Sequence, residues 1–62
     1  MELGIFIYNF TRHEWLALDE KSWTISMSDA ACFEQDNGRE TADAIMEREC
    51  GDDICYLMQA LH

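Results

Sequence analysis

A chain of 62 residues, 48% of them apolar, with no proline and three glycines, forms one domain at most and is neither a linker nor a low-complexity tail. Thirteen carboxylates against four basic residues give a net charge of −9, which disfavours nucleic acid and anionic membranes as partners and favours a basic protein surface. The short apolar run near the N-terminus follows an acid and is typical of neither a signal peptide nor a membrane span, so we expect a cytoplasmic protein.

The first predicted element is a strand over residues 3–10, which are rich in Ile, Phe and Tyr. Both alternating sets of side chains are apolar, as expected for a central strand that is covered on both faces. A turn over residues 11–13 leads to a second strand over 14–18, antiparallel to the first. A polar turn over residues 19–22 follows it.

The middle of the chain is less regular. Residues 23–27 either extend the sheet or cross it. Ser28 is predicted to cap a single helical turn that ends near Ala31. Residues 32–34 are predicted to be a short extended piece.

The one clear helical pattern starts near Asn37, which forms an N-terminal capping signature with Glu40. An apolar stripe at helical spacing follows, made by Ala42, Ile45 and Met46. Gly51 is predicted to end the helix. The last strand covers residues 54–61, and Ile54, Tyr56, Met58 and Ala60 form one apolar face. These elements predict an α+β fold for a single domain over residues 1–62: a small antiparallel sheet of three to four strands packed by one main helix plus a short helical turn.

The three cysteines are predicted to be reduced, partly buried thiols, because their number is odd and the expected location is cytoplasmic. A weaker alternative is a metal module made by Cys32, Cys50, Cys55 and His62, although the chain has no CxxC pair. We therefore expect no cofactor.

We also expect no catalytic site. His13-Glu14 begins like a zinc-protease motif, but Ala17 stands where the second histidine belongs. Cys32 or Cys55 could pair with His13 as nucleophile and base, but a structural thiol is the favoured interpretation. The chain has no glycine-rich phosphate loop.

The carboxylates follow a spatial pattern. On a helical wheel Glu40, Asp43 and Glu47 fall within about 60° of one another, and their centre is about 140° from the apolar stripe. A face of one sign differs from the usual mixture of Glu and Lys on a solvated helix. The predicted partner-binding surface comprises this ridge, its extension past both helix ends and a second cluster near residues 14–20: Asp36, Glu40, Asp43, Glu47, Asp52, Asp53, Glu14, Asp19 and Glu20. Glu49 falls in the apolar sector and disagrees with the pattern.

The aromatic residues are mostly predicted to be core, above all Phe6, Phe33 and Tyr56. With only one helix, however, one side of the sheet would be thinly covered. Trp15 or Trp23 could then be exposed and anchor a partner or close a homodimer.

The order of the packing residues resembles small phage and prophage domains of the strand-strand-helix-strand type over about two thirds of the chain. The residues concerned are Trp23-Thr24, Ala30 or Ala31, Phe33, Ala42, Ile45, Met46 and residues 56–61. In length and acidity the chain also resembles small acidic phage anti-defence proteins, including anti-CRISPR proteins that imitate DNA.

The second resemblance implies an inhibitor that acts by DNA mimicry. Its expected partner is a basic DNA-binding surface, first that of a type I CRISPR surveillance complex and next that of a restriction enzyme. The alternative hypothesis is a small structural or assembly protein that dimerises through a face of its sheet, with its acidity serving solubility only.

Overall fold

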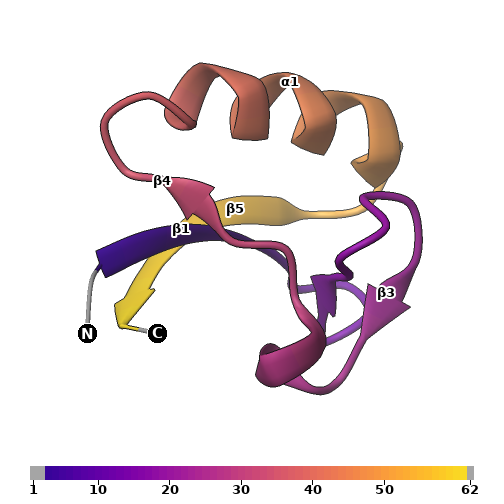
Figure 1. The fold of residues 1–62 in the computed structure, drawn as a ribbon. Helices are drawn as coiled ribbons and strands as arrows, with labels where there is room; N and C mark the ends of the chain where they lie inside the picture. Colours follow the sequence, from indigo (N-terminus) through magenta and orange to yellow (C-terminus); the bar gives the residue numbers. More distant parts are fainter. Residues whose placement is uncertain (1–2, 62) are drawn as a thin grey trace.

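The computed structural model describes residues 3–61 and shows an antiparallel sheet with one helix lying across it (Figure 1). The elements, in chain order, are β1 (Leu3–Asn9), β2 (Glu14–Leu16), β3 (Trp23–Thr24), the 3₁₀ turn η1 (Met27–Asp29), β4 (Phe33–Glu34), α1 (Arg39–Cys50) and β5 (Cys55–Leu61). The predicted α+β class is confirmed. The sheet has five strands, because residues 23–24 join its edge and residues 33–34 also pair.

β1 is the central strand, as its two apolar faces predict. On one side it pairs antiparallel with β5 along its whole length, from Leu3↔Leu61 to Asn9↔Cys55. On the other side β2 pairs with its end and β4 with its start. Ile5 and Ile7 are fully buried and Phe6 is 2% exposed, so both faces of β1 are covered.

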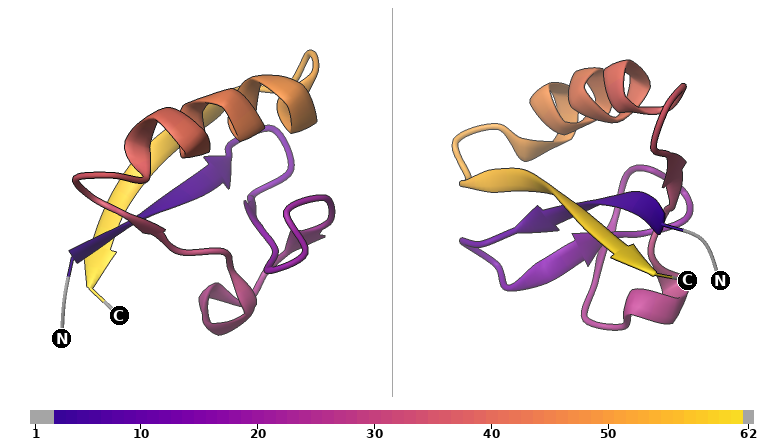
Figure 2. Two further views of the ribbon diagram at one scale, coloured as in Figure 1. Left: turned by 45° about the horizontal axis from the view of Figure 1, so that its top comes forward. Right: turned by 90° about the vertical axis from the view of Figure 1, so that its left-hand side faces the viewer.

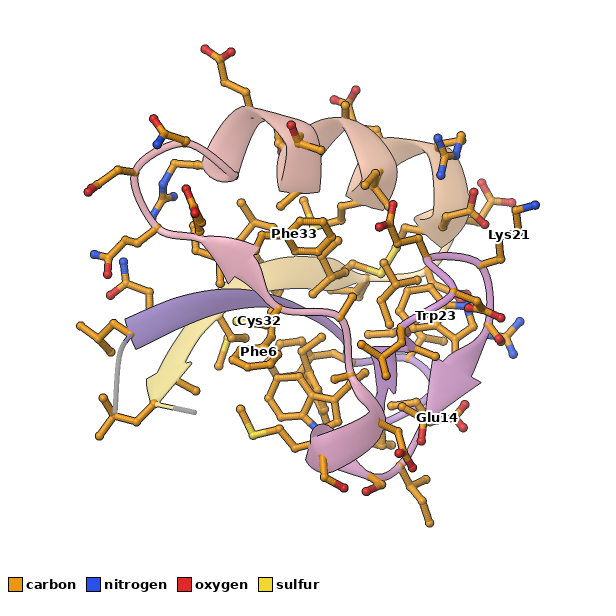
Figure 3. All side chains as sticks on the ribbon, in the orientation of Figure 1. Phe6, Glu14, Lys21, Trp23, Cys32 and Phe33 are labelled. Carbon is orange, nitrogen blue, oxygen red and sulfur yellow. A yellow bond between two sulfur atoms is a disulfide. The ribbon has the colours of Figure 1, made fainter. Side chains whose placement is uncertain are left out.

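The main core lies between the sheet and α1, which covers one face of the sheet in both views of Figure 2. Alternate residues of β1 point towards the helix, and Ala42 and Ile45 of the apolar stripe meet them. The buried members are Ile5, Ile7, Leu16, Ala42 and Ile45. Phe33 and Trp23 are half-buried and pack against this cluster beneath the helix (Figure 3).

The 3₁₀ turn η1, which follows β3, lies below the opposite face of the sheet (Figure 1). There the ring of Phe6 meets the edge of Trp15, with the ring centroids 6.0 Å apart. Ala30 is held in place by an isolated bridge to Ala17. This cover reaches only part of the face, which leaves the β1–β5 side of it open.

The N-terminus of α1 is not built as predicted. Gly38, not Asn37, is the capping residue, and no side chain bonds to the first turn. The Asn37 amide instead donates to the Glu34 carboxylate at 3.3 Å. The reason lies in the turn after β4, which winds tightly enough for the Gly38 N–H to donate to the Glu34 carbonyl at 2.8 Å. A Cβ at position 38 would lie 2.6 Å from the Glu34 nitrogen, so only glycine fits.

The predicted cap at Ser28 is also wrong. η1 starts at Met27, its capping residue is Ser26, and Ser28 lies inside the turn. The Ser26 and Ser28 hydroxyls bond to each other at 2.8 Å instead of capping the backbone. At the other end of the helix, Gly51 ends α1 as predicted and has a φ of 59°, which side chains other than glycine rarely adopt.

The cysteine prediction is wrong for two of the three residues, because Cys50 and Cys55 form a disulfide. Cys50 ends α1 and Cys55 begins β5. The short reversal between them places their Cα atoms 6.4 Å apart, which is within the range of a disulfide. The third residue, Cys32, is a free thiol but is exposed, not partly buried. An odd number of cysteines is therefore compatible with one pair and one remaining thiol.

Candidate protein-binding surfaces

The outer face of α1 carries the predicted acidic ridge, which we define as Glu40, Asp43 and Glu47. All three side chains are exposed, while Ala42 and Ile45 are buried on the inner face. Carboxylates project from this side of the helix in Figure 3. At 1.5 Å per residue the ridge covers about 10 Å of helix axis. The sequence therefore predicted this arrangement correctly, because helical periodicity alone places the three residues on one face.

The charges of the ridge are not neutralised within the described part of the chain. Residues 3–61 contain two salt bridges, Arg12–Asp53 and Arg48–Glu49, and neither involves the ridge. Glu49 lies near the C-terminus of the helix, where the helix dipole disfavours a negative charge. Its carboxylate accepts from Arg48 Nε at 2.7 Å, and this ion pair offsets that cost. Two of the four basic residues are thus paired elsewhere.

The predicted extension of the ridge past the helix ends holds only in part. Asp36 before α1 and Asp52 after it are exposed. Asp53, in contrast, accepts hydrogen bonds from Asn9 Nδ2 at 2.9 Å and from Arg12 Nε at 3.1 Å. These two bonds lower the pKa of its carboxyl group. Asp53 therefore holds the β1–β2 turn against the α1–β5 turn, and its assignment to the partner-binding surface stays a prediction.

Asn9 is the buried centre of this contact and is fully inaccessible to solvent. Besides its bond to Asp53, its side-chain oxygen accepts from the Arg12 backbone N–H at 2.9 Å. The Thr11 hydroxyl accepts from the Ile54 N–H at 2.9 Å. Together these bonds join the two turns that meet at one end of the sheet.

The three residues of the second predicted cluster lie in different environments. Asp19 accepts from the backbone N–H groups of Lys21 and Ser22, both at 2.9 Å, and from the Ser22 hydroxyl. These bonds, led by that of the Ser22 hydroxyl, lower the pKa of Asp19 to about 2. Glu14 and Glu20 are half-buried, and Glu14 lies well below the helix in Figure 3. Asp19 thus shapes its own turn, and Glu14 does not join the ridge.

An aromatic surface on the opposite face of the sheet was only partly foreseen. Tyr8 contacts Trp15 and Phe10 edge-on, with ring centroids 4.6 and 4.7 Å apart. Phe10 contacts Tyr56 at 5.3 Å. Phe10 is 41% and Tyr56 is 56% exposed, so the prediction that Tyr56 is core is wrong. The sequence showed that Tyr56 and Met58 share one face of the last strand. It did not show how much of this face η1 covers.

The two tryptophans lie in different surroundings. Trp15 and Trp23 are both half-buried, Trp15 within this aromatic surface and Trp23 against the main core. Neither is the fully exposed indole that the sequence left open.

The cysteine and histidine residues that could have formed a nucleophile–base pair do not lie close together. Cys55 is bound in the disulfide. Cys32 precedes the β4 residue that pairs with Ile5, whereas His13 follows the other end of β1. Ile5 and Asn9 are four residue steps apart along β1, or about 13 Å. Desolvation raises the pKa of the Cys32 thiol, which keeps it in the unreactive protonated form.

The metal alternative loses two of its four ligands to the disulfide, and its fourth, His62, lies outside the described residues. Within residues 3–61, no group of three or more His, Cys, Asp or Glu side chains is arranged to hold an ion. No helix in this part of the chain has the length and apolar character needed to cross a bilayer.

Comparisons of the chain with protein-family models, with curated proteins and with solved structures find no match.

Proposed function

We propose that this protein is an anti-defence inhibitor of the phage type that binds a basic, DNA-contacting protein surface through the acidic ridge of α1. The specific target in this proposal is a type I CRISPR surveillance complex, and the protein acts by occupancy without catalysing a reaction. The observation that carries the proposal is the ridge itself: three exposed carboxylates on one helix face with no salt bridge to any described residue.

Charge density supports DNA imitation along the ridge but not over the whole molecule. The chain exposes 4190 Å² for nine net charges, or about 470 Å² per charge. A B-DNA cylinder of ~10 Å radius carries a charge about every 100 Å². Along α1, however, the three carboxylates are about 4.5 and 6 Å apart along the axis, which is much closer to the axial spacing of one DNA strand, a phosphate about every 3.4 Å, than the average over the molecule is. Contact through the ridge is therefore the arrangement in which mimicry is effective.

Chemistry favours arginine and lysine as the contacted groups. Carboxylates accept the paired N–H donors of arginine in the same bidentate manner as phosphate oxygens do. Asp36 and Asp52 stand exposed before and after the helix and would extend the contact. Because this attraction is electrostatic, it steers association and weakens with salt.

Inhibition of this kind takes place in the host cytoplasm, which is the location we propose. The Cys50–Cys55 disulfide of the structure belongs to oxidising conditions, and a reducing cytosol would open it. The ridge does not depend on their bond, because Ala42 and Ile45 anchor α1 to the sheet one to two turns before Cys50.

The direct test is competition for DNA. A purified type I surveillance complex is incubated with its target duplex and increasing amounts of the protein, and bound duplex is measured by gel shift. We expect wild-type protein to displace the duplex. The ridge variant Glu40→Gln/Asp43→Asn/Glu47→Gln should compete about 100-fold less well, because three charge-assisted contacts of at least ~1 kcal/mol each are lost.

A matched control separates the ridge from overall charge. The variant Glu2→Gln/Asp29→Asn/Glu34→Gln also removes three carboxylates, all outside the predicted partner-binding surface, and leaves the ridge intact. It should compete nearly as well as wild type. Equal loss in both variants, or no displacement by wild-type protein, would refute the proposal.

A further inference from the structure

One long strand edge is left without a partner. β5 pairs with β1 along all seven of its residues, and no other strand of residues 3–61 pairs with its outer side. β5 lies at the margin of the sheet in the right-hand view of Figure 2. Its outer backbone N–H and C=O groups are therefore available to a further strand.

This edge lacks the features by which proteins prevent unwanted strand pairing. Natural edge strands are short, or carry lysine, proline or a bulge. β5 is one of the two longest strands of this sheet, and its sequence, Cys-Tyr-Leu-Met-Gln-Ala-Leu, has no charge and no proline. In a chain with 27% charged residues, an uncharged edge of this length indicates an interface.

The side chains along the edge are apolar and exposed. Tyr56 and Leu61 are 56% and 58% exposed, and Met58 is 37% exposed. Ile54, immediately before the strand, is 58% exposed, and Phe10 extends the surface across β1. Ile54, Tyr56 and Met58 alternate along one face beside the outer edge, whereas Leu61 has the opposite face and Phe10 follows β1. With about 200 Å² for each fully exposed large side chain, these three residues offer on the order of 300 Å² of apolar surface.

We propose that a second copy of this chain pairs with β5, in antiparallel orientation about a twofold axis near Met58, so that the two sheets become one. A register centred on Met58 lets all seven residues of each strand pair and places each Tyr56 beside the Ala60 of the second copy. Twofold symmetry requires a self-complementary strand, and an uncharged one satisfies this requirement. This inference does not depend on the proposed function.

Charge selects both the occupant and the orientation. Two chains of net charge −9 repel each other, and β5 is a seven-residue stretch where they can meet without opposing carboxylates. The acidic turn at Asp52 and Asp53 precedes β5. Antiparallel pairing places this turn beside the Leu61 end of the other copy, whereas parallel pairing would bring the two acidic turns together.

The available area sets the strength of the dimer. A standard interface covers about 800 Å² on each partner, of which Ile54, Tyr56 and Met58 would supply about a third and the paired strands part of the rest. We therefore expect a reversible dimer in the micromolar range. The twofold axis is perpendicular to the sheet, so both helices lie on the same side and the two acidic ridges face the same way.

The oligomeric state in solution tests this proposal. Sedimentation equilibrium should show a shift from monomer to dimer as the concentration rises to about 1 mM. Tyr56→Lys and, separately, Met58→Lys should remain monomeric, with folding verified by circular dichroism. Each lysine lowers the net negative charge and so weakens general repulsion, which means that loss of the dimer would reflect the edge itself.

The matched control is Ile25→Lys, which makes the same kind of change at a residue that is 83% exposed but outside β5. This variant should dimerise like wild type. Hydrogen exchange of the wild-type protein should show β5 amides that become protected as the concentration rises. A wild-type chain that stays monomeric, a control variant that loses the dimer as the β5 variants do, or a dimer without added β5 protection would overturn the proposal.

Discussion

Two carboxylates that the sequence assigned to partner binding have a structural role in the fold. Asp53 joins two turns through Asn9 and Arg12, and Asp19 binds the backbone of its own turn. Both lie in chain reversals, where short acidic side chains commonly accept backbone or neighbouring donors. Sequence reasoning counted them as surface charge because it could not place their donors.

Asp19 provides a prediction about pH. Its pKa is lowered from 3.8 to about 2 in the folded chain, so the charged form stabilises the fold above pH 3.8 and this stabilisation is lost as the pH falls towards 2. Wild type should melt at a higher temperature than Asp19→Asn at neutral pH, and the difference should shrink below pH 4. Thermal unfolding of both proteins across this range measures the difference. A difference that stays constant down to the lowest pH at which both fold would contradict the role of the charge.

At the scale of the elements, the sequence predicted what periodicity controls. β1 and β5 follow from runs of apolar residues, and the two faces of α1 follow from the spacing of Ala42 and Ile45 against Glu40, Asp43 and Glu47. Of the candidate site, the ridge was predictable for the same reason.

The features that the sequence did not predict correctly depend on contacts between elements. The cap at Gly38 is set by its close approach to Glu34, and the exposure of Tyr56 is set by how far η1 reaches under the sheet. The disulfide depends on the path of the turn between α1 and β5. Neither propensity nor spacing contains this information.

The disulfide gives a prediction at this scale. The pair is five residues apart, and closing so short a loop in the unfolded chain is worth about 2 kcal/mol by chain entropy. Cys50→Ser/Cys55→Ser should therefore remain folded but lose about 2 kcal/mol in urea unfolding. Cys32→Ser, at an exposed free thiol, should change the free energy of unfolding by no more than about 0.5 kcal/mol. Equal effects of the two changes would argue against the bond.

At the scale of the whole molecule, charge and apolar surface are segregated. The acidic ridge lies on the outer side of α1, and the aromatic surface with the β5 edge lies on and beside the other face of the sheet. A molecule that needed its acids for solubility alone would gain from having some along the exposed β5 edge. Their absence there suggests two separate contacts, one with a basic partner and one with a second copy.

The claim that the ridge replaces phosphates is tested most directly by its affinity for the target at two salt concentrations. Titration calorimetry would give the dissociation constant of wild-type protein and of Glu40→Gln/Asp43→Asn/Glu47→Gln for a purified type I surveillance complex. The account predicts tight wild-type binding at low salt that weakens steeply at high salt, and weak binding of the variant with little dependence on salt. Equal affinities of the two proteins at low salt would contradict it.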